Sequence, residues 1–484
     1  MSGARRMGER IAAFLEREPP ARLVQRPGFV WMVVGTTCIG AFIGQLDASI
    51  VQLVLPVLEA EFRCGLGAAS WVAIAYLLSF AAALAPFTRL SQTTGRKRFY
   101  ILGFLVFAAA SALCALADSL GSLVACRILQ GIGGALLGAN SVTLLVAAAG
   151  KERRGRAMGW FAAAQALGVG VGPAVGGWLM SEFGWRSVFW VTVPFGLAGA
   201  LAAWVLVPPS PPAPAKTRFD WFGTVLLGPG LVALLLVLSL GQDWGLTSVR
   251  TLVTAGLALT LLIGFGLREG RTESPLIRLS LLRIRDFSAG LVGITLSYAL
   301  LYGMFFLMSY ALVRGGRLTP VEAGLHLAIL PVALGMAAPF SGSWSERRGA
   351  RGPTLTGMVC CGVAVWLLRE VLGADDLGSG PLLGSLALYG VGLGLFISPN
   401  NSATLAAAPP ADSAMAGGLL NLFRVLGTSI GVATASSVLT WCLAGLALGA
   451  DPFPAVAQAL ILLWAMAVVA AMAALSQREK GRPA

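Results

Sequence analysis

Charged residues are scarce in this chain, and the short motifs that bind metals or nucleotides are missing. Asp, Glu, Lys and Arg make up only 12% of its 484 residues, whereas soluble domains carry about 25%. The seven cysteines form no CxxC pair, His326 is the single histidine, and no GxxxxGK[ST] stretch occurs. These shortages exclude a soluble globular enzyme and a disulfide scaffold. They also predict a protein with no metal site, no ATP site and no cofactor.

Apolar residues dominate instead. Hydrophobic residues make up 57% of the chain, and a further 61 residues are glycines. A membrane-spanning helix needs about 20 apolar residues, and on this measure the chain contains fourteen candidate spans. They lie at 30–58, 67–88, 99–117, 121–145, 156–180, 187–207, 221–240, 248–267, 287–313, 321–344, 354–372, 381–405, 414–440 and 454–475. The sequence therefore predicts an all-α membrane protein.

The net charge of +13 is distributed as in a membrane protein rather than a nucleic-acid-binding protein. With the N-terminus placed in the cytoplasm, 27 of the 35 Lys and Arg residues fall in cytoplasmic tails and loops, and six fall outside. The remaining two, Arg127 and Arg424, lie within spans. Cytoplasmic loops of membrane proteins carry an excess of Lys and Arg. We therefore expect cytoplasmic termini, the lipid bilayer as a partner and no nucleic-acid partner.

An internal repeat organises the fourteen spans. Short patterns of the first half reappear in the second half after about 255–261 residues, which pairs spans one to six with spans nine to fourteen. The paired segments are 131–133 with 392–394, 140–141 with 401–402, 167–172 with 426–431, and 91–98 with 345–351. Two parallel six-helix repeats are typical of transporters that bind their substrate between the halves.

This pairing divides the chain into seven parts, and spans seven and eight become an inserted hairpin. The first part is a basic cytoplasmic tail at 1–29, in which residues 6–18 form either an interfacial amphipathic helix or a disordered segment. The others are an N-terminal six-helix bundle (30–207), a Pro-rich cytoplasmic linker (208–220), the hairpin (221–267), a cytoplasmic loop (268–286), a C-terminal six-helix bundle (287–475) and a cytoplasmic tail (476–484).

Six segments resemble motifs of one transporter family. They are 46–56 (LDASIVQLVLP), 127–134 (RILQGIGG), 170–177 (GVGPAVGG), 185–196 (WRSVFWVTVPFG), 274–282 (SPLIRLSLL) and 421–427 (NLFRVLG). Together they resemble the fourteen-helix drug:proton antiporters of the major facilitator superfamily, the EmrB/QacA type. The resemblance implies two six-helix bundles that alternate access across a bacterial-type cytoplasmic (inner) membrane. It also implies export of an amphipathic organic compound in exchange for protons, with the proton gradient as the energy source.

Two other functions remain open at this level. An exporter of a lipid, a fatty acid or a natural product has the same fold, and the scarcity of acids favours it. A non-transporting membrane sensor is the second alternative, but such a protein needs a soluble domain that the sequence does not contain. No feature of the sequence supports a periplasmic adaptor partner, and substrate identity is not readable from it.

Asp47 and Arg127 are the candidate proton-coupling residues. Of the 22 acidic residues, Asp47 is the only one well inside a predicted span. An ionised carboxylate at the bilayer centre costs about 2.5–3.5 kcal/mol on insertion scales, so protonation relieves a real penalty. The alternative is a carboxylate held in a fixed hydrogen bond. Arg127 is the expected partner, because helices one and four are neighbours in this fold. The alternative is a static structural ion pair, or an arginine that snorkels near the cytoplasmic end of its span.

Polar and aromatic residues inside spans are the candidates for the substrate cavity. The aromatic residues cluster on the ninth span, where they either line the cavity or face lipid. The polar residues either line the cavity or form interhelical hydrogen bonds. The full set is Gln130, Asn140, Gln165, Tyr298, Tyr302, Phe305, Phe306, Asn400, Asn401, Asn421 and Arg424.

A glycine face on the fifth span is a candidate conformational element. Gly168, Gly172 and Gly176 are four residues apart, with Pro173 and Gly177 beside them. Small residues at this spacing allow close helix packing, and a proline kinks a helix. This pattern predicts a helix that slides or bends against the opposite bundle.

Two cytoplasmic loops resemble the family's gating motif, in which an acid pairs with arginines. The first loop has Gln92 where the acid is expected and Thr88 where glycine is usual. We therefore predict that any charge latch survives only in the second loop, at Glu346. Plain topology determinants are an equal interpretation of the basic residues. The candidate gating residues are Gln92, Gly95, Arg96 and Arg98 in the first loop, and Glu346, Arg347 and Gly349 in the second.

Overall fold

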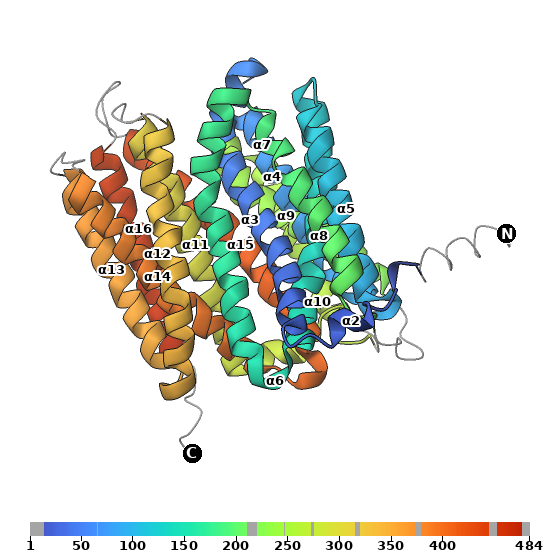
Figure 1. Cartoon of the computed structure of the whole chain (residues 1–484). Helices are drawn as coiled ribbons and strands as arrows, with labels where there is room; N and C mark the ends of the chain where they lie inside the picture. Colours follow the sequence, from blue (N-terminus) through green and yellow to red (C-terminus); the bar gives the residue numbers. More distant parts are fainter. Residues whose placement is uncertain are drawn as a thin grey trace.

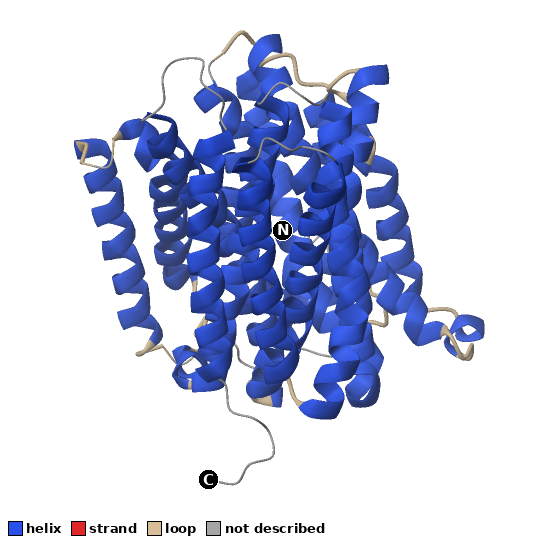
Figure 2. Cartoon of the chain, turned by 90° about the vertical axis from the view of Figure 1, so that its left-hand side faces the viewer, coloured by secondary structure: helices blue, strands red, loops and turns tan. Residues whose placement is uncertain are grey.

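A computed structural model of the chain describes residues 14–64, 66–210, 220–245, 247–272, 275–314, 320–373, 379–444 and 453–476. Within these ranges all regular structure is helical, as Figure 2 shows. The helices are α2 (Ala21–Val24), α3 (Phe29–Glu61), α4 (Leu66–Thr94), α5 (Arg96–Ala115), α6 (Leu120–Phe183), α7 (Ser187–Trp190), α8 (Thr192–Leu206), α9 (Trp221–Trp244), α10 (Val249–Glu269), α11 (Arg285–Arg314), α12 (Pro320–Arg348), α13 (Arg351–Gly373), α14 (Ser379–Ala407), α15 (Ser413–Ala444) and α16 (Phe453–Ser476), with short 3₁₀ turns at Leu279–Arg283 and Pro410–Asp412.

Fourteen of these helical segments are long and apolar enough to cross a membrane. Each overlaps one predicted span, so the predicted fold class and span count are confirmed. The long helix α6 holds two spans, Leu120–Gly150 and Arg156–Phe183, joined at Gly150 with φ of 70°. The predicted tail helix over 6–18 and most of the Pro-rich linker lie outside the described residues.

Glycine marks the turns that the two halves share. Gly95 before α5 has φ of 121°, and Gly349 before α13 has φ of 83°. A side chain other than glycine rarely adopts this backbone conformation. The two loops predicted to correspond, 91–98 and 345–351, therefore reverse the chain through the same type of residue.

The helices form two groups that meet in the centre of the molecule (Figure 1). In the first group α6 packs against α3, α4 and α5; in the second, α11 packs against α15 and α16, and α14 against α12 and α13. The groups contact each other mainly through α6 with α12 and α4 with α15. The hairpin of α9 and α10 packs against α4 and α15, so it touches both groups.

The repeat is real, but its register on the fourth and twelfth spans differs by two residues from the sequence prediction. A Cβ placed on Gly133 would overlap the backbone of Phe107 in α5, and one placed on Gly392 would overlap that of Cys361 in α13. Gly133 and Gly392 are thus equivalent, at the same interval of 259 residues as Gly168 and Gly427. The predicted pairing of Gly133 with Gly394, and of Asn140 with Asn401, is therefore wrong.

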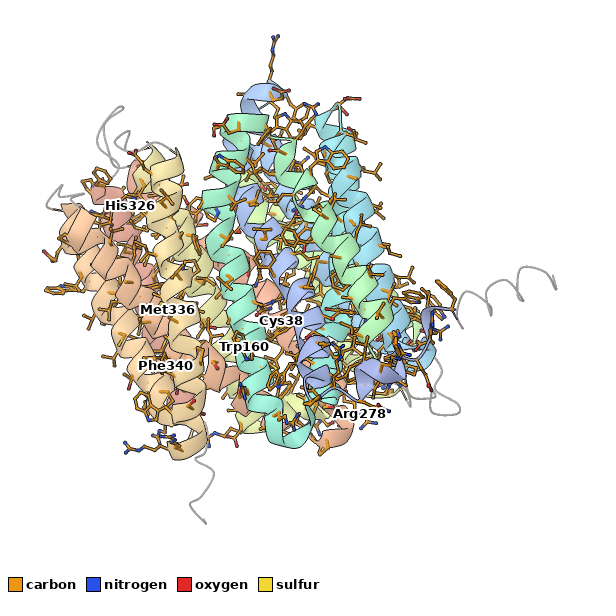
Figure 3. The ribbon with its side chains drawn as sticks, in the orientation of Figure 1. Cys38, Trp160, Arg278, His326, Met336 and Phe340 are labelled. Carbon is orange, nitrogen blue, oxygen red and sulfur yellow. The ribbon has the colours of Figure 1, made fainter. Side chains whose placement is uncertain are left out.

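Large apolar side chains cover the outside of the bundle. Trp160 on α6 and Met336 and Phe340 on α12 are 57%, 67% and 76% exposed, and Figure 3 shows them on the near face. Contiguous apolar surface of this kind is unfavourable in water. It suits a protein whose outer surface contacts lipid chains.

Candidate functional site

A buried ion pair joins α3 to α6. The Arg127 guanidinium lies 2.7 Å from the Asp47 carboxylate, and each side chain is only 1% exposed. Gln130, one turn after Arg127, donates its side-chain N–H to the other carboxylate oxygen at 2.8 Å. The structure thus brings together the two residues predicted as proton partners and adds Gln130 to them.

Further contacts offset the cost of burying these charges. Arg127 also donates to the Val72 carbonyl at 2.9 Å and stacks on the Tyr76 ring at 4.5 Å. Gln130 donates to the Ser111 hydroxyl at 2.8 Å. A buried ion pair is tolerated when its remaining hydrogen-bonding groups are satisfied, and here both partners meet that condition. Protonation of Asp47 would leave Arg127 charged without its counter-ion.

A central hollow lies between the two helix groups. It is lined by α3, α4 and α6 from one half and by α11 and α15 from the other. Two adjoining lobes extend it along α6, α11, α12 and α14. The polar and aromatic residues around the three parts are Gln45, Tyr76, Phe80, Ser141, Phe161, Gln165, Tyr298, Tyr302, Ser398, Asn401, Asn421, Arg424 and Thr428.

Three hydrogen bonds cross the hollow from one half to the other. Tyr302 donates its hydroxyl to Gln45 at 3.1 Å, and Tyr298 donates to Gln165 at 3.3 Å. Asn421 on α15 donates to the carbonyl of Gly138 on α6 at 2.7 Å. These bonds must break if the two halves separate, so they connect the lining of the hollow to the relative position of the halves.

Tyr76 connects the hollow to the ion pair. Its ring lines the hollow and also stacks on Arg127. Asp47 and Arg127 themselves do not line any of the three parts. The ion pair is therefore separated from the hollow by one aromatic side chain.

The structure places six of the predicted cavity residues at the hollow, namely Gln165, Tyr298, Tyr302, Asn401, Asn421 and Arg424. The other five do not line these three parts. Gln130 belongs to the ion-pair cluster, Asn140 donates to the Leu136 carbonyl within its own helix, and Asn400 donates to Gly290 of α11. Phe305 and Phe306 lie elsewhere on α11, outside the lining.

Sequence reasoning missed Gln45 and Tyr76. Gln45 is a polar residue inside the first span, two positions before Asp47. That position alone could have suggested it. Nothing in the sequence distinguishes Tyr76 from other aromatic residues, because its role comes from contact with Arg127.

The glycine face of the fifth span packs against a different helix from the one predicted. Cβ atoms placed on Gly168, Gly172 and Gly176 would meet Phe42, Ser49 and Ile50 of α3, within the same half. The opposite half is contacted by the other face, where Gly170 lies against Pro331 and Gly324 lies against the Pro173 carbonyl. The four-residue pattern therefore joins α6 to α3, and Pro173 lies at the boundary between the halves. Gly177, also on this helix, is buried.

An acid from the N-terminal segment takes the place of the acid missing from the first gating loop. Glu16 pairs with Arg98 at 3.3 Å and accepts a hydrogen bond from the Ser210 backbone N–H at 2.8 Å. Lys97 donates its ammonium to the Arg17 carbonyl at 2.6 Å. The acid of this ion pair therefore comes from a distant part of the sequence, and the assignment of the gating latch to Glu346 stays a prediction.

The other gating candidates make weaker contacts. Gln92 accepts from Arg89 at 3.1 Å, within one helix turn. Thr88 stands where the family motif usually has glycine, and it lies against Gly418 of α15. A glycine in the C-terminal half thus leaves room for the larger threonine side chain. Nothing among the described residues assigns a role to Arg96 or Arg347, and the Glu346 side chain lies outside the described residues. Its role as a latch stays a prediction.

Sequence comparison places this architecture in a known class of membrane proteins. The Major Facilitator Superfamily model matches residues 37–432, and the chain belongs to that family. The riboflavin transporter RibZ of Clostridioides difficile is 30% identical over 84% of this chain and 88% of that protein. The tetracenomycin C resistance and export protein of Streptomyces glaucescens is 30% identical over 86% and 76%. The multidrug resistance protein Stp of Mycobacterium tuberculosis is 31% identical over 83% and 74%.

Proposed function

We propose that this protein exports amphipathic organic compounds from the cell in exchange for protons. The compound binds in the central hollow between the two halves. Protons move inward down their gradient, which is the only energy source, and no cofactor takes part. Both termini lie in the cytoplasm of a bacterial-type cell, because most Lys and Arg residues then lie on the cytoplasmic side.

The observation that carries this proposal is the Asp47–Arg127 pair behind Tyr76. Protonation of Asp47 removes the charge that holds Arg127 at 2.7 Å, and Arg127 stacks on the ring that lines the hollow. A change at the carboxylate therefore reaches the compound-binding surface through two side chains, Arg127 and Tyr76. Conversely, a compound pressing on Tyr76 alters the environment of the pair, as reciprocal coupling requires.

The relatives support the same type of function. One is named as an export protein for tetracenomycin C, one as a multidrug resistance protein, and one as a transporter of riboflavin. Riboflavin and tetracenomycin C are therefore suitable first substrates to test on this chain.

Transport by the Asp47→Asn variant in proteoliposomes tests the proposal. Asn keeps the shape of Asp but cannot exchange a proton, so pH-driven uptake of riboflavin or tetracenomycin C should fall to background. Asp118→Asn is the matched control, since the Asp118 side chain is 97% exposed, and it should transport normally. Undiminished pH-driven transport by Asp47→Asn would overturn the proton-coupling mechanism.

A further inference from the structure

The charge of the central hollow comes from one residue. Among the described side chains that line its three parts, Arg424 is the only ionisable one other than tyrosines. Asp47, the acid that a cationic compound would need, is 1% exposed and already paired with Arg127. The surface presented to a bound compound is therefore positive.

Arg424 has no acidic partner among the described residues. Its guanidinium lies over the Tyr298 ring, 5.8 Å from the ring centre. The side chain is half-buried and lines both the main hollow and the adjoining lobe. An arginine presents up to five N–H donors in a rigid fork that matches a carboxylate, and an uncompensated cation inside a membrane protein is costly. Both facts favour an anion next to Arg424.

The repeat makes Arg424 a specific departure from symmetry. Arg424 precedes Gly427 by three residues, as Gln165 precedes Gly168, so the two side chains occupy equivalent positions in the two halves. Both line the hollow, and both contact Tyr298. The fold accommodates a neutral amide at this position in one half, so the positive charge in the other half is not required for packing.

The surroundings of Arg424 fit a flat body with polar edges. Tyr76, Tyr298 and Tyr302 line the hollow. Asn401 lines the same adjoining lobe as Arg424, and its buried side-chain carbonyl oxygen has no hydrogen-bond partner in the described structure. Such an oxygen is costly unless it accepts a hydrogen bond. A compound with an N–H or O–H group would satisfy it.

We propose that the hollow selects planar aromatic organic anions, which place an ionised carboxylate or equivalent group on Arg424 and their rings against the tyrosines. This inference names the substrate class of the efflux function proposed above and rests on it. Charge-assisted hydrogen bonds contribute about 1.5–3 kcal/mol each, or roughly tenfold or more in affinity.

Binding to purified protein in lipid nanodiscs tests the inference with three probes that share one ring system. The probes are anthracene-2-carboxylate, anthracene-2-carboxamide and anthracen-2-ylmethylammonium, followed by their fluorescence at neutral pH. We expect the carboxylate to bind about tenfold or more tightly than the other two. Tighter or equal binding of the ammonium probe, or no binding of any probe at millimolar concentration, would overturn the inference.

Two substitutions of Arg424 test whether this residue causes the tighter binding of the carboxylate probe. Arg424→Gln copies the residue of the equivalent position and should remove the advantage of the carboxylate, while carboxamide affinity changes less than about twofold. Arg424→Lys keeps the charge and should retain part of the advantage. Arg250→Gln is the matched control, because Arg250 also stacks on an aromatic ring, that of Trp244 at 5.2 Å, but lies outside the hollow.

The outcomes separate this inference from the proposed function. The binding assay uses no gradient, so loss of proton coupling would leave the carboxylate preference intact. An unchanged carboxylate preference in Arg424→Gln would refute the role of Arg424 even if Asp47→Asn abolished transport. If Arg424→Gln does not fold, the preference of the native protein and the Arg424→Lys variant still decide the question.

Discussion

In the N-terminal half the first and fourth spans meet at a buried ion pair, whereas the positions equivalent to that pair in the C-terminal half are leucines. Gly168 packs on Phe42 as Gly427 packs on Thr295, so Leu300 occupies the position of Asp47. By the equivalence of Gly133 and Gly392, the counterparts of Arg127 and Gln130 are Leu386 and Tyr389.

One hydrogen bond between the equivalent spans is kept in the C-terminal half, although the charges are absent there. The Tyr389 hydroxyl donates to the Leu300 carbonyl at 3.0 Å, where Gln130 donates to Asp47 at 2.8 Å in the other half. Leu300 and Leu386 are fully buried. The same packing is thus compatible with a charged and an apolar core, which indicates that the ion pair is not needed to form the bundle.

Copying the C-terminal core into the N-terminal half should have the largest effect. The double variant Asp47→Leu/Arg127→Leu should lose pH-driven transport entirely, because the carboxylate that carries the proton is gone, yet it should melt near the native temperature. Arg127→Leu alone should lose about 3–5 kcal/mol of stability, since it leaves Asp47 buried without a partner. Proteoliposome transport and thermal unfolding in detergent measure the two effects.

The comparison breaks down if the double variant is as unstable as the single one. In that case the ion pair would be a requirement of folding in this half, and the halves would not be interchangeable. Retained proton-driven transport in the double variant would instead contradict the role of the pair in coupling.

Alanine at the two equivalent glycines should destabilise the protein by similar amounts, which tests whether the two halves pack in the same way. Gly168→Ala and Gly427→Ala each place a methyl group against a backbone carbonyl of the neighbouring helix. Each should cost about 1–3 kcal/mol, the usual range for overpacking. Gly159→Ala is the control, because no atom lies within 4 Å of its Cβ position. A large cost in only one half would show that the packing is not symmetric.

The smallest effect is expected from the Glu16 contact with the first loop. Glu16→Gln should weaken the N-terminal segment by about 0.5–1 kcal/mol, because the ion pair is only partly buried. Cleavage by trypsin after Arg17 should then accelerate roughly two- to fivefold. Glu18→Gln is the control, since Glu18 is exposed. Equal rates for both variants would show that Glu16 does not hold the segment.

A comparison with the second loop extends this prediction. Because Glu346 is the acid of the repeat in that loop, Glu346→Gln should alter the accessibility of the hollow more than Gln92→Ala does. Labelling of a cysteine introduced at Ala162, which lines two lobes, can compare them. Equal and negligible effects would leave both loops as topology determinants only.

Sequence reasoning performed best where a single helix carries the signal. The spans follow from runs of apolar residues, and Asp47 stands out because an acid within such a run is costly. It performed worst on contacts between helices. The four-residue glycine spacing shows that a face packs closely, but it does not name the partner helix, and the prediction of the opposite bundle was wrong.

Long-range pairing also escaped the sequence. Glu16 and Arg98 are far apart in the chain, and only the path of the N-terminal segment along α5 and α8 brings them together. Likewise, Asn401 and Arg424 reach the hollow, whereas Asn400 points to Gly290 of α11. Adjacent residues on a helix differ by about 100° in direction. An error of one residue in the predicted inward face therefore decides whether a side chain is assigned to the hollow.

The sequence by itself determined the membrane location, the fourteen spans, the twofold repeat and the proton-exchanging candidate, because each of these is written in local composition or spacing. Only the tertiary structure decided that Tyr76 contacts both Arg127 and the hollow, and that Arg424 lines the hollow without an acidic partner among the described residues. The physical reason is that charge compensation depends on distances between helices. Those distances come from packing, which no single segment encodes.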